Sequence, residues 1–183
     1  MLPVDVESLI EYASTNDVEY IHFVGHQPSK DGSITKSCFS QWWDSEFTDE
    51  MGLYYKTAEQ FMMLQKAKLF GDEVSLEKIL KSTTPIEAKE LGRKVKGFDP
   101  ESWDRCKFNI VVHGNMLKFS QNESLKEFLL STGDKILVEA AHYDPVWGIG
   151  MRANHVNACI PEKWAGENLL GFALMEVREQ LKT

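Results

Sequence analysis

The stretch of residues 54–72, which reads YYKTAEQFMMLQKAKLFGD, constrains the fold more than any other part of this chain. Thr57 followed three positions later by Gln60 is typical of a capping box, in which both side chains bond the backbone N–H groups left free at a helix start. Apolar residues then recur at helical spacing until the break at Gly71. We therefore predict a helix that begins at Thr57 and packs an apolar face against the rest of the protein.

A second stripe of this predicted helix carries charge. Glu59, Met62, Met63 and Lys66 lie beside the apolar face, and Lys66 follows Glu59 by seven positions. Both charged side chains therefore share one side of the helix, roughly 10 Å apart along its axis, within reach of one molecule of nucleoside size. Glu59 lies in the first turn, where the helix dipole favours a carboxylate, so we expect it to stay ionised. The structural alternative is a solvated charged face without function.

Composition indicates an ordinary globular protein. The 183 residues, 43% of them hydrophobic and 26% charged, suffice for one domain with a sizeable core. A formal net charge of -8 argues against sequence-independent binding to nucleic acid or anionic membranes, which needs clustered Lys and Arg. The acidic start MLPVDVESLIEYAS resembles no signal or transit peptide, and no apolar run is long enough to span a membrane, so we expect a cytoplasmic protein. The Cys and His residues lack metal-ligand spacing, so we expect no metal and no cofactor.

Elsewhere the patterns predict mostly helices. Helical spacing, capping residues and breakers indicate helices near residues 6–16, 76–80, 84–93, 99–117, 122–130 and 168–181. Three short apolar or alternating segments indicate strands of one small sheet, at residues 20–25, 53–55 and 136–140. We predict a mainly α (α+β), compact multihelical single domain over residues 1–183, with residues 1–19 as an N-terminal helical extension.

The loop HYDPVWGIGMRANH, between the last predicted strand and the last helix, has the features of a ligand site. Asp144 precedes a proline, which restricts its backbone, while Gly148 and Gly150 permit positive φ or close approach of a ligand. Trp147 has no periodic partner in this loop. An acid and a Trp delivered from a core strand favour binding. In the structural alternative, Asp144 bonds its own backbone and Trp147 covers the core.

Two adjacent tryptophans in CFSQWWDSEF cannot both face one side of the core. We therefore expect Trp42 or Trp43 to be partly exposed, where it could stack on a flat heterocycle. Ordinary packing under a loop is the alternative. Arg93 lies at the end of a predicted helix. Its positive charge could simply stabilise the helix dipole, or its guanidinium could bind a phosphate.

Together these motifs resemble the NADAR family, the YbiA-like N-glycosidases. The resemblance runs from about residue 21 to 181, through YKTAEQFMMLQKAKLFGD, EAKELGRKVKGFDPESW, MLKFSQN, LLSTGDKILVEAAHYDPVWGIG and WAGENLLGFALMEVREQL. It implies a compact, mainly helical fold and hydrolysis of a ribosyl C–N bond. Implied substrates are phosphorylated intermediates of the riboflavin pathway or ADP-ribosylated guanine. In FSQWW this chain departs from the family, with Gln41 where Asn is typical, so recognition of the sugar or base is expected to differ.

The resemblance also implies roles for individual residues. It implies catalytic roles for Glu59, Lys66 and Asp144, and substrate-binding roles for Phe39, Trp42, Arg93, Trp103, Trp147 and Gly148. Glu59 would stabilise the developing cation or activate water, and Asp144 would take the other acid/base role in a shared cleft. Lys66 would bind phosphate or form a Schiff base with a ring-opened sugar, which requires a lowered pKa. The alternatives are a non-catalytic reader of ADP-ribose and a purely structural interaction domain.

Overall fold

The structure is a computed structural model, and it describes residues 2–182. Helices dominate this part of the chain: α1 (Val6–Thr15), α2 (Ala58–Leu69), α3 (Glu73–Leu80), α4 (Pro85–Arg93), α5 (Pro100–Ser120), α6 (Glu123–Ser131) and α7 (Leu169–Leu181). Short strands and 3-10 turns fill the intervals: β1 (Tyr20–Phe23), η1 (Lys36–Phe39), β2 (Phe47–Thr48), β3 (Tyr54–Tyr55), β4 (Ile136–Glu139) and η2 (Pro161–Lys163). The predicted mainly α (α+β) class is confirmed.

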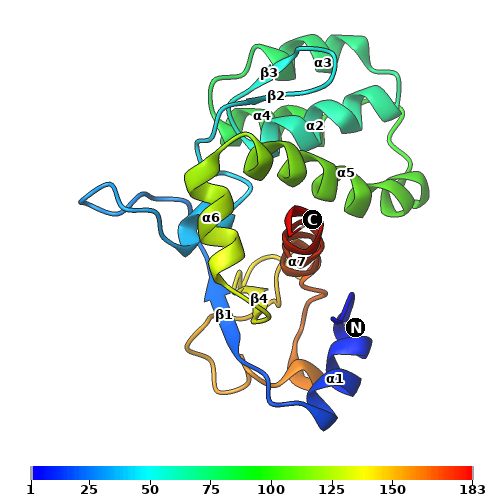
Figure 1. The fold of residues 1–183 in the computed structure, drawn as a ribbon. Coiled ribbons are helices and arrows are strands. Elements are labelled where there is room, and N and C mark those ends of the chain that lie inside the picture. The colour runs from blue at the N-terminus through cyan, green and yellow to red at the C-terminus, as the bar shows by residue number, and fades with distance from the viewer. Residues whose placement is uncertain (1, 183) are drawn as a thin grey trace. The chain divides into compact units, whose positions relative to one another are not determined.

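The chain divides into two compact units (Figure 1). One contains Met1–Ser40 and Glu127–Thr183, and the other contains Gln41–Lys126. The single domain predicted over residues 1–183 stays a prediction. Within residues 2–182, no helix is both long and apolar enough to cross a bilayer.

Helix α2 begins where its capping residue predicts. Thr57 has an extended backbone, and its hydroxyl accepts a hydrogen bond from Gln60 N at 3.2 Å. The second half of the predicted box is wrong, because Gln60 Oε1 bonds Lys56 N at 2.9 Å instead of the N–H of Thr57. The other end of the Gln60 amide donates to the carbonyl oxygens of Ile79 and Ser82, at 3.1 and 3.2 Å. Gln60 therefore ties the start of α2 to the end of α3, which sequence spacing could not indicate.

In unit Gln41–Lys126, helices α3, α4 and α5 all pack against α2. Two glycines allow the close approach. A methyl group on Gly92 of α4 would overlap the sulfur of Met63, and one on Gly114 of α5 would lie 2.6 Å from Phe61 Cδ1. Helix α2 is consequently the central helix of this unit, and α4 and α5 are held against it at fixed positions.

A hairpin precedes α2 in the same unit. Strands β2 and β3 pair antiparallel, with Phe47 opposite Tyr55. The carboxylate of Asp49 closes the turn: Oδ1 accepts from Met51 N at 3.0 Å and Leu53 N at 2.9 Å, and Oδ2 accepts from the Tyr55 hydroxyl at 2.8 Å. One buried carboxylate therefore bonds three groups of the hairpin.

The other unit contains a separate two-stranded sheet. Strands β1 and β4 pair in parallel, from Tyr20 opposite Ile136 to Phe23 opposite Glu139. The prediction of one sheet from three strand segments is wrong, because within residues 2–182 β3 pairs with β2 and not with β1 or β4. Backbone hydrogen bonding selects partners in space, and sequence patterns identify strands without their partners.

Helix α7 packs against β4 in this unit. A methyl group on Gly171 would overlap the carbonyl oxygen of Leu137, so this glycine lets α7 approach β4 closely. Arg178 of the same helix is fully buried and donates to Thr132 Oγ1 at 2.9 Å and to Lys135 O at 2.8 Å. These contacts fix α7 beside the turn that leads into β4.

Candidate functional site

Glu59 is a buried acid in the first turn of α2. It is 4% exposed, and its neighbours Met62 and Met63 are also buried. Its backbone N–H donates to the carbonyl oxygen of Gln41 at 2.9 Å. A solvated charged stripe is thus excluded for this residue. Buried acids gather at functional sites, so Glu59 is a candidate for a role in binding or catalysis.

Lys66 lies two turns further along α2 and is half-buried. Its ammonium nitrogen lies 4.3 Å from the centroid of the Phe98 ring and 5.4 Å from that of Trp103. Burial lowers the pKa of Lys66; the charge of Glu59 acts in the opposite direction, and the charge of Arg93 lowers the pKa further. The pKa of Lys66 is therefore shifted in the direction that Schiff-base chemistry requires.

Arg93 brings a second cation to the same unit. It closes α4 in the last turn, as predicted, and its side chain is exposed. Within the described chain, Arg93 forms no ion pair, so its guanidinium is available to an anion. Gly92 places it there, because only a residue without a side chain lets α4 approach Met63 of α2. At this position Arg93 can interact favourably with the helix dipole and also bind an anion.

Aromatic side chains accompany these charges. Trp103, in the first turns of α5, is half-buried beside Lys66. Trp43 is 8% exposed, while Trp42 is half-buried with the ammonium of Lys89 5.5 Å from its ring centroid. The expectation that one of the two adjacent tryptophans is partly open is confirmed, and the open one is Trp42.

Phe39 occupies a core position in the other unit. It is fully buried, and its ring lies 5.5 Å from the ring of Phe23 and 5.5 Å from that of Phe128, between centroids. This packing gives no support to the predicted substrate-binding role. The resemblance implied this role for Phe39 as part of the FSQWW segment, whereas the 3-10 turn η1 directs its ring into an aromatic cluster.

Asp144 has the geometry of the structural alternative. Its Oδ1 accepts hydrogen bonds from Val146 N at 3.0 Å and Trp147 N at 2.9 Å, which closes a turn around Pro145. Asp144 lies in the unit of Glu127–Thr183, whereas Glu59 lies in unit Gln41–Lys126. The predicted convergence of the two carboxylates on one cleft stays a prediction.

The loop that carries Asp144 is held tightly by its own unit. A Cβ on Gly148 would lie 2.8 Å from the carbonyl oxygen of Glu139, and Gly150 has a φ of 68°. The carbonyl oxygens of Val146, Trp147 and Gly148 accept from the N–H groups of residues 169, 170 and 168. Both glycines therefore serve close packing of the backbone, and Trp147 is left half-buried. The substrate-binding role of Gly148 stays a prediction.

Asn168 holds this loop in place, although the sequence indicated it only as the start of the last helix. It is fully buried with a left-handed backbone, φ 54°. Its Oδ1 accepts from Glu139 N at 2.9 Å, and its Nδ2 donates to Leu137 O at 3.0 Å. An Asn tolerates this conformation better than most residues and matches the open edge of β4. The only sequence signal was an Asn directly before a helical apolar pattern.

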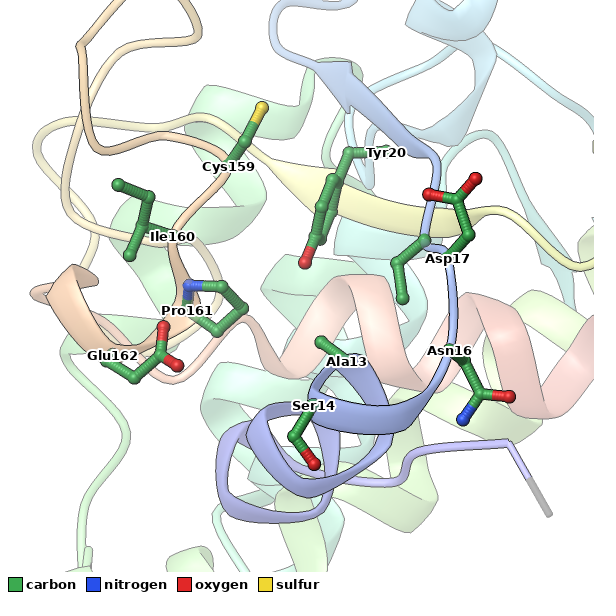
Figure 2. Close-up of a pocket in the computed structure, with 10 residues that line it drawn as sticks. Ala13, Ser14, Asn16, Asp17, Tyr20, Cys159, Ile160, Pro161 and Glu162 are labelled. Atoms are coloured by element: carbon green, nitrogen blue, oxygen red, sulfur yellow. The ribbon is translucent and has the colours of Figure 1, made fainter.

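A separate pocket lies in the unit that contains α1 (Figure 2). Its volume is about 350 Å³, and it is lined by residues 13, 14, 16–18, 20 and 159–162. Burial raises the pKa of Tyr20 in its wall, and the charges of Cys159 and Glu162 add to this effect. None of the predicted site residues lines it. Among the described residues, no three of His, Cys, Asp or Glu are grouped to hold a metal ion.

Comparison with known proteins identifies the family. The family model described as the NADAR domain matches residues 23–182. The chain belongs to the NADAR family. The predicted family is therefore confirmed, and helix α1 precedes the part of this NADAR chain that the model matches.

Several relatives of this NADAR chain are named N-glycosidases. It is 42% identical over 166 residues to N-glycosidase R617 of Acanthamoeba polyphaga mimivirus, covering 88% of this chain and 96% of that protein. It is 32% identical over 130 residues to N-glycosidase YbiA of Escherichia coli (strain K12), covering 71% and 72%. The NMR structure of E. coli YbiA matches with a TM-score of 0.71 at 27% identity, over 92% of this chain and 88% of that one. These names agree with the predicted enzyme class.

Proposed function

We propose that this protein is an N-glycosidase that hydrolyses a ribosyl C–N bond in a phosphorylated ribosylamine, an intermediate of riboflavin synthesis, or in ADP-ribosylated guanine. The observation that carries the proposal is a buried Glu59 coupled electrostatically to a half-buried Lys66, with Arg93 nearby, in one unit of a NADAR chain. The names of the relatives support the coarse activity, and these three side chains support a phosphorylated sugar as substrate.

Glu59 supplies the negative charge that this reaction needs. Breaking a ribosyl C–N bond gives C1 the character of an oxocarbenium ion, which a carboxylate stabilises most strongly where water is excluded. At 4% exposure Glu59 meets that condition. The same carboxylate would activate the attacking water as a general base.

Lys66 and Arg93 supply positive charge for the phosphate. In a second version of the mechanism, neutral Lys66 adds to C1 of the ring-opened sugar and forms an imine as the amine leaves with a proton. Water then hydrolyses the imine to the sugar aldehyde and free Lys66. The burial of Lys66 and the charge of Arg93 both favour the neutral amine.

Asp144 and Trp147 complete the proposed assignment. Asp144 takes the second acid/base role through Oδ2, because Oδ1 is held by the loop backbone. Trp147, Trp42 and Trp103 are half-buried and offer ring surface to a base or sugar. Phe39 is left out of the proposal because it is fully buried.

The test is a hydrolysis assay on the whole chain. Wild-type protein and Glu59→Gln are incubated with ribosylaminopyrimidine phosphates, ADP-ribosylguanosine and NAD, and products are detected by mass. We expect release of the base or amine from one of the first two substrates, and a loss of about 10²- to 10⁴-fold in Glu59→Gln. Borohydride during turnover separates the two versions for Lys66, since only an imine leaves a reduced adduct on that residue.

The alternative function is a module that binds ADP-ribose without catalysis. It predicts a thermal shift with ADP-ribose in wild type and in Glu59→Gln, and no product in either. Turnover by the wild type that Glu59→Gln lacks contradicts this alternative. A structural interaction domain predicts neither a shift nor product.

A further inference from the structure

Gln41 and Asn115 form a buried amide pair directly beside Glu59. Gln41 is 7% exposed, Asn115 is fully buried, and the two lie 74 positions apart in the sequence. Asn115 Nδ2 donates to Gln41 Oε1 at 2.7 Å, and the carbonyl oxygen of Gln41 accepts from Glu59 N at 2.9 Å. The side chain of Gln41 is therefore hydrogen-bonded to α5, and its backbone is hydrogen-bonded to the first turn of α2.

The orientation of the Gln41 amide follows from the hydrogen bonds of Asn115. The atom of Asn115 that faces Gln41 also lies 2.9 Å from the carbonyl oxygen of Val111, so it must be the nitrogen. The Gln41 atom bonded to it must then be the acceptor Oε1. This leaves the NH₂ group of Gln41 at the other end of the amide, and it donates to no group within residues 2–182.

The pair is incompletely satisfied, which points to a ligand. Asn115 Oδ1 is buried without a hydrogen-bond partner, whereas the Gln41 NH₂ group is not among the buried unpartnered atoms and is open to solvent or a ligand. A polar atom buried without a partner is unfavourable, and a functional role is one explanation for such an atom. The backbone of Gln41 is hydrogen-bonded to that of Glu59, which in the proposed function acts at C1 of a ribosyl group. The hydroxyl closest to that carbon is the 2-hydroxyl.

We propose that Gln41 is a specificity-determining residue of the glycosidase site, whose NH₂ group donates a hydrogen bond to the 2-hydroxyl oxygen of the substrate. Asn115 is the positioning residue that holds the NH₂ group toward the ligand. This inference rests on the proposed function. The bond exists before and during the reaction, so it contributes to KM and to the preference for ribosyl over 2-deoxyribosyl compounds, and little to kcat.

The test compares two ligands that differ by one hydroxyl. Binding of ribose 5-phosphate and 2-deoxyribose 5-phosphate to the whole chain is measured by calorimetry. The wild type is expected to bind the ribose compound about tenfold more tightly. Gln41→Met should remove this preference while the affinity for the 2-deoxy compound stays unchanged, which also shows that the variant is folded. Retention of the full preference in Gln41→Met overturns the proposal.

A variant at position 115 tests the positioning role. Asn115→Leu has a similar volume but donates no hydrogen bond to Gln41 Oε1, so the Gln41 amide is no longer held toward the ligand. The preference for ribose 5-phosphate should shrink, while the affinity for the 2-deoxy compound stays unchanged. A full preference retained by Asn115→Leu contradicts the positioning role of Asn115.

Failures of the two proposals have different signatures. A wild type that hydrolyses ribosyl substrates but binds both sugar phosphates equally overturns the role of Gln41 alone. A wild type that shows the preference without any hydrolysis overturns catalysis and leaves the recognition by Gln41 standing. Absence of binding to either sugar phosphate, together with absence of turnover, overturns both.

Discussion

The Lys66 ammonium nitrogen lies 4.3 Å from the centroid of the Phe98 ring. The cation therefore rests on an aromatic face instead of in bulk water, and Trp103 covers it at 5.4 Å. Desolvation by this surrounding is the largest cause of the lowered pKa of Lys66, and the two nearby charges of Glu59 and Arg93 act in opposite directions. The reactivity of this amine is thus set by three helices and the loop that carries Phe98.

The first prediction concerns that pKa. Titration of Lys66 Nζ by NMR should give a pKa below the ordinary value of 10.5. Arg93→Gln removes a repelling cation and should raise the pKa, whereas Glu59→Gln removes an attracting carboxylate and should lower it further. Equal pKa values in all three proteins would show that Glu59 and Arg93 are too distant to act on Lys66.

The same shift predicts how stability depends on pH. The unfolded chain binds more protons than the folded one between the lowered pKa of Lys66 and 10.5. The free energy of unfolding contributed by Lys66 should therefore increase as pH rises through that window. Urea denaturation of the wild type and Lys66→Met should show this difference in slope, and parallel curves would contradict it.

Asp144 requires a pair of variants. Asp144→Asn keeps the oxygen that accepts from Val146 N and Trp147 N, while Asp144→Ala removes it. We expect Asp144→Ala to lose about 1–3 kcal/mol of stability in urea denaturation, and Asp144→Asn to lose little. If the charge takes part in catalysis, Asp144→Asn should still lose about 10²- to 10⁴-fold in turnover. Wild-type turnover in Asp144→Asn would leave Asp144 as a turn residue only.

Gly92 and Met63 should be coupled. Alanine at position 92 overlaps the Met63 side chain, and overpacking of this kind costs about 1–3 kcal/mol. A Met63→Ala background removes the contacts with the sulfur and Cγ and leaves one at 3.1 Å with Cβ, while the higher helix propensity of alanine, about 1 kcal/mol, remains. Gly92→Ala should therefore destabilise the wild type clearly more than it destabilises that background. A double-mutant cycle measures the coupling, and additive effects would refute the packing argument.

The Tyr55–Asp49 hydrogen bond should depend on pH. Burial raises the pKa of Asp49, but hydrogen bonds from Leu53 N, the Tyr55 hydroxyl and Met51 N outweigh burial and hold it below 3.8. Tyr55→Phe should cost about 1.5–3 kcal/mol at pH 7, because it removes a buried hydrogen bond to a charged group. That difference is present above pH 3.8 and shrinks as pH falls through the pKa of folded Asp49.

Tyr54→Phe is the matched control for that experiment. Tyr54 is 43% exposed on the neighbouring position of the hairpin, and a hydrogen bond to Glu46 raises the pKa of its hydroxyl to about 12. Because this bond is exposed to solvent, losing the hydroxyl should change stability little at either pH. Urea denaturation of both variants at pH 7 and pH 3 provides the comparison. A Tyr55→Phe effect that is equal at the two pH values would exclude Asp49 as the partner that matters.

Local chemistry allowed accurate prediction of the helices. Thr57, Thr84 and Asp99 each cap the helix that the sequence assigned to them, because a side-chain oxygen needs only N–H groups two or three residues ahead. The same argument failed for Gln60, whose amide found carbonyl groups about 20 positions away. A long flexible side chain bonds whatever the fold brings near it, and spacing along one helix cannot reveal that.

In the candidate site, too, some features follow from the sequence and others only from the structure. Glu59, Lys66 and Arg93 follow from helix periodicity and resemblance, and the structure adds that Glu59 is buried and Lys66 rests on aromatic rings. The amide orientation of Gln41 could not be read from the sequence, since Asn115 fixes it from 74 positions away.

By itself the sequence determined the family, the mainly helical class and the chemical groups available to a substrate. Those properties depend on residue identity and on contacts within a few positions. Only the tertiary structure decided which carboxylate is dehydrated, which amine has a lowered pKa and which way an amide points. Each of these depends on groups distant in sequence that exclude water or offer a hydrogen bond, and that arrangement exists only once the chain has packed.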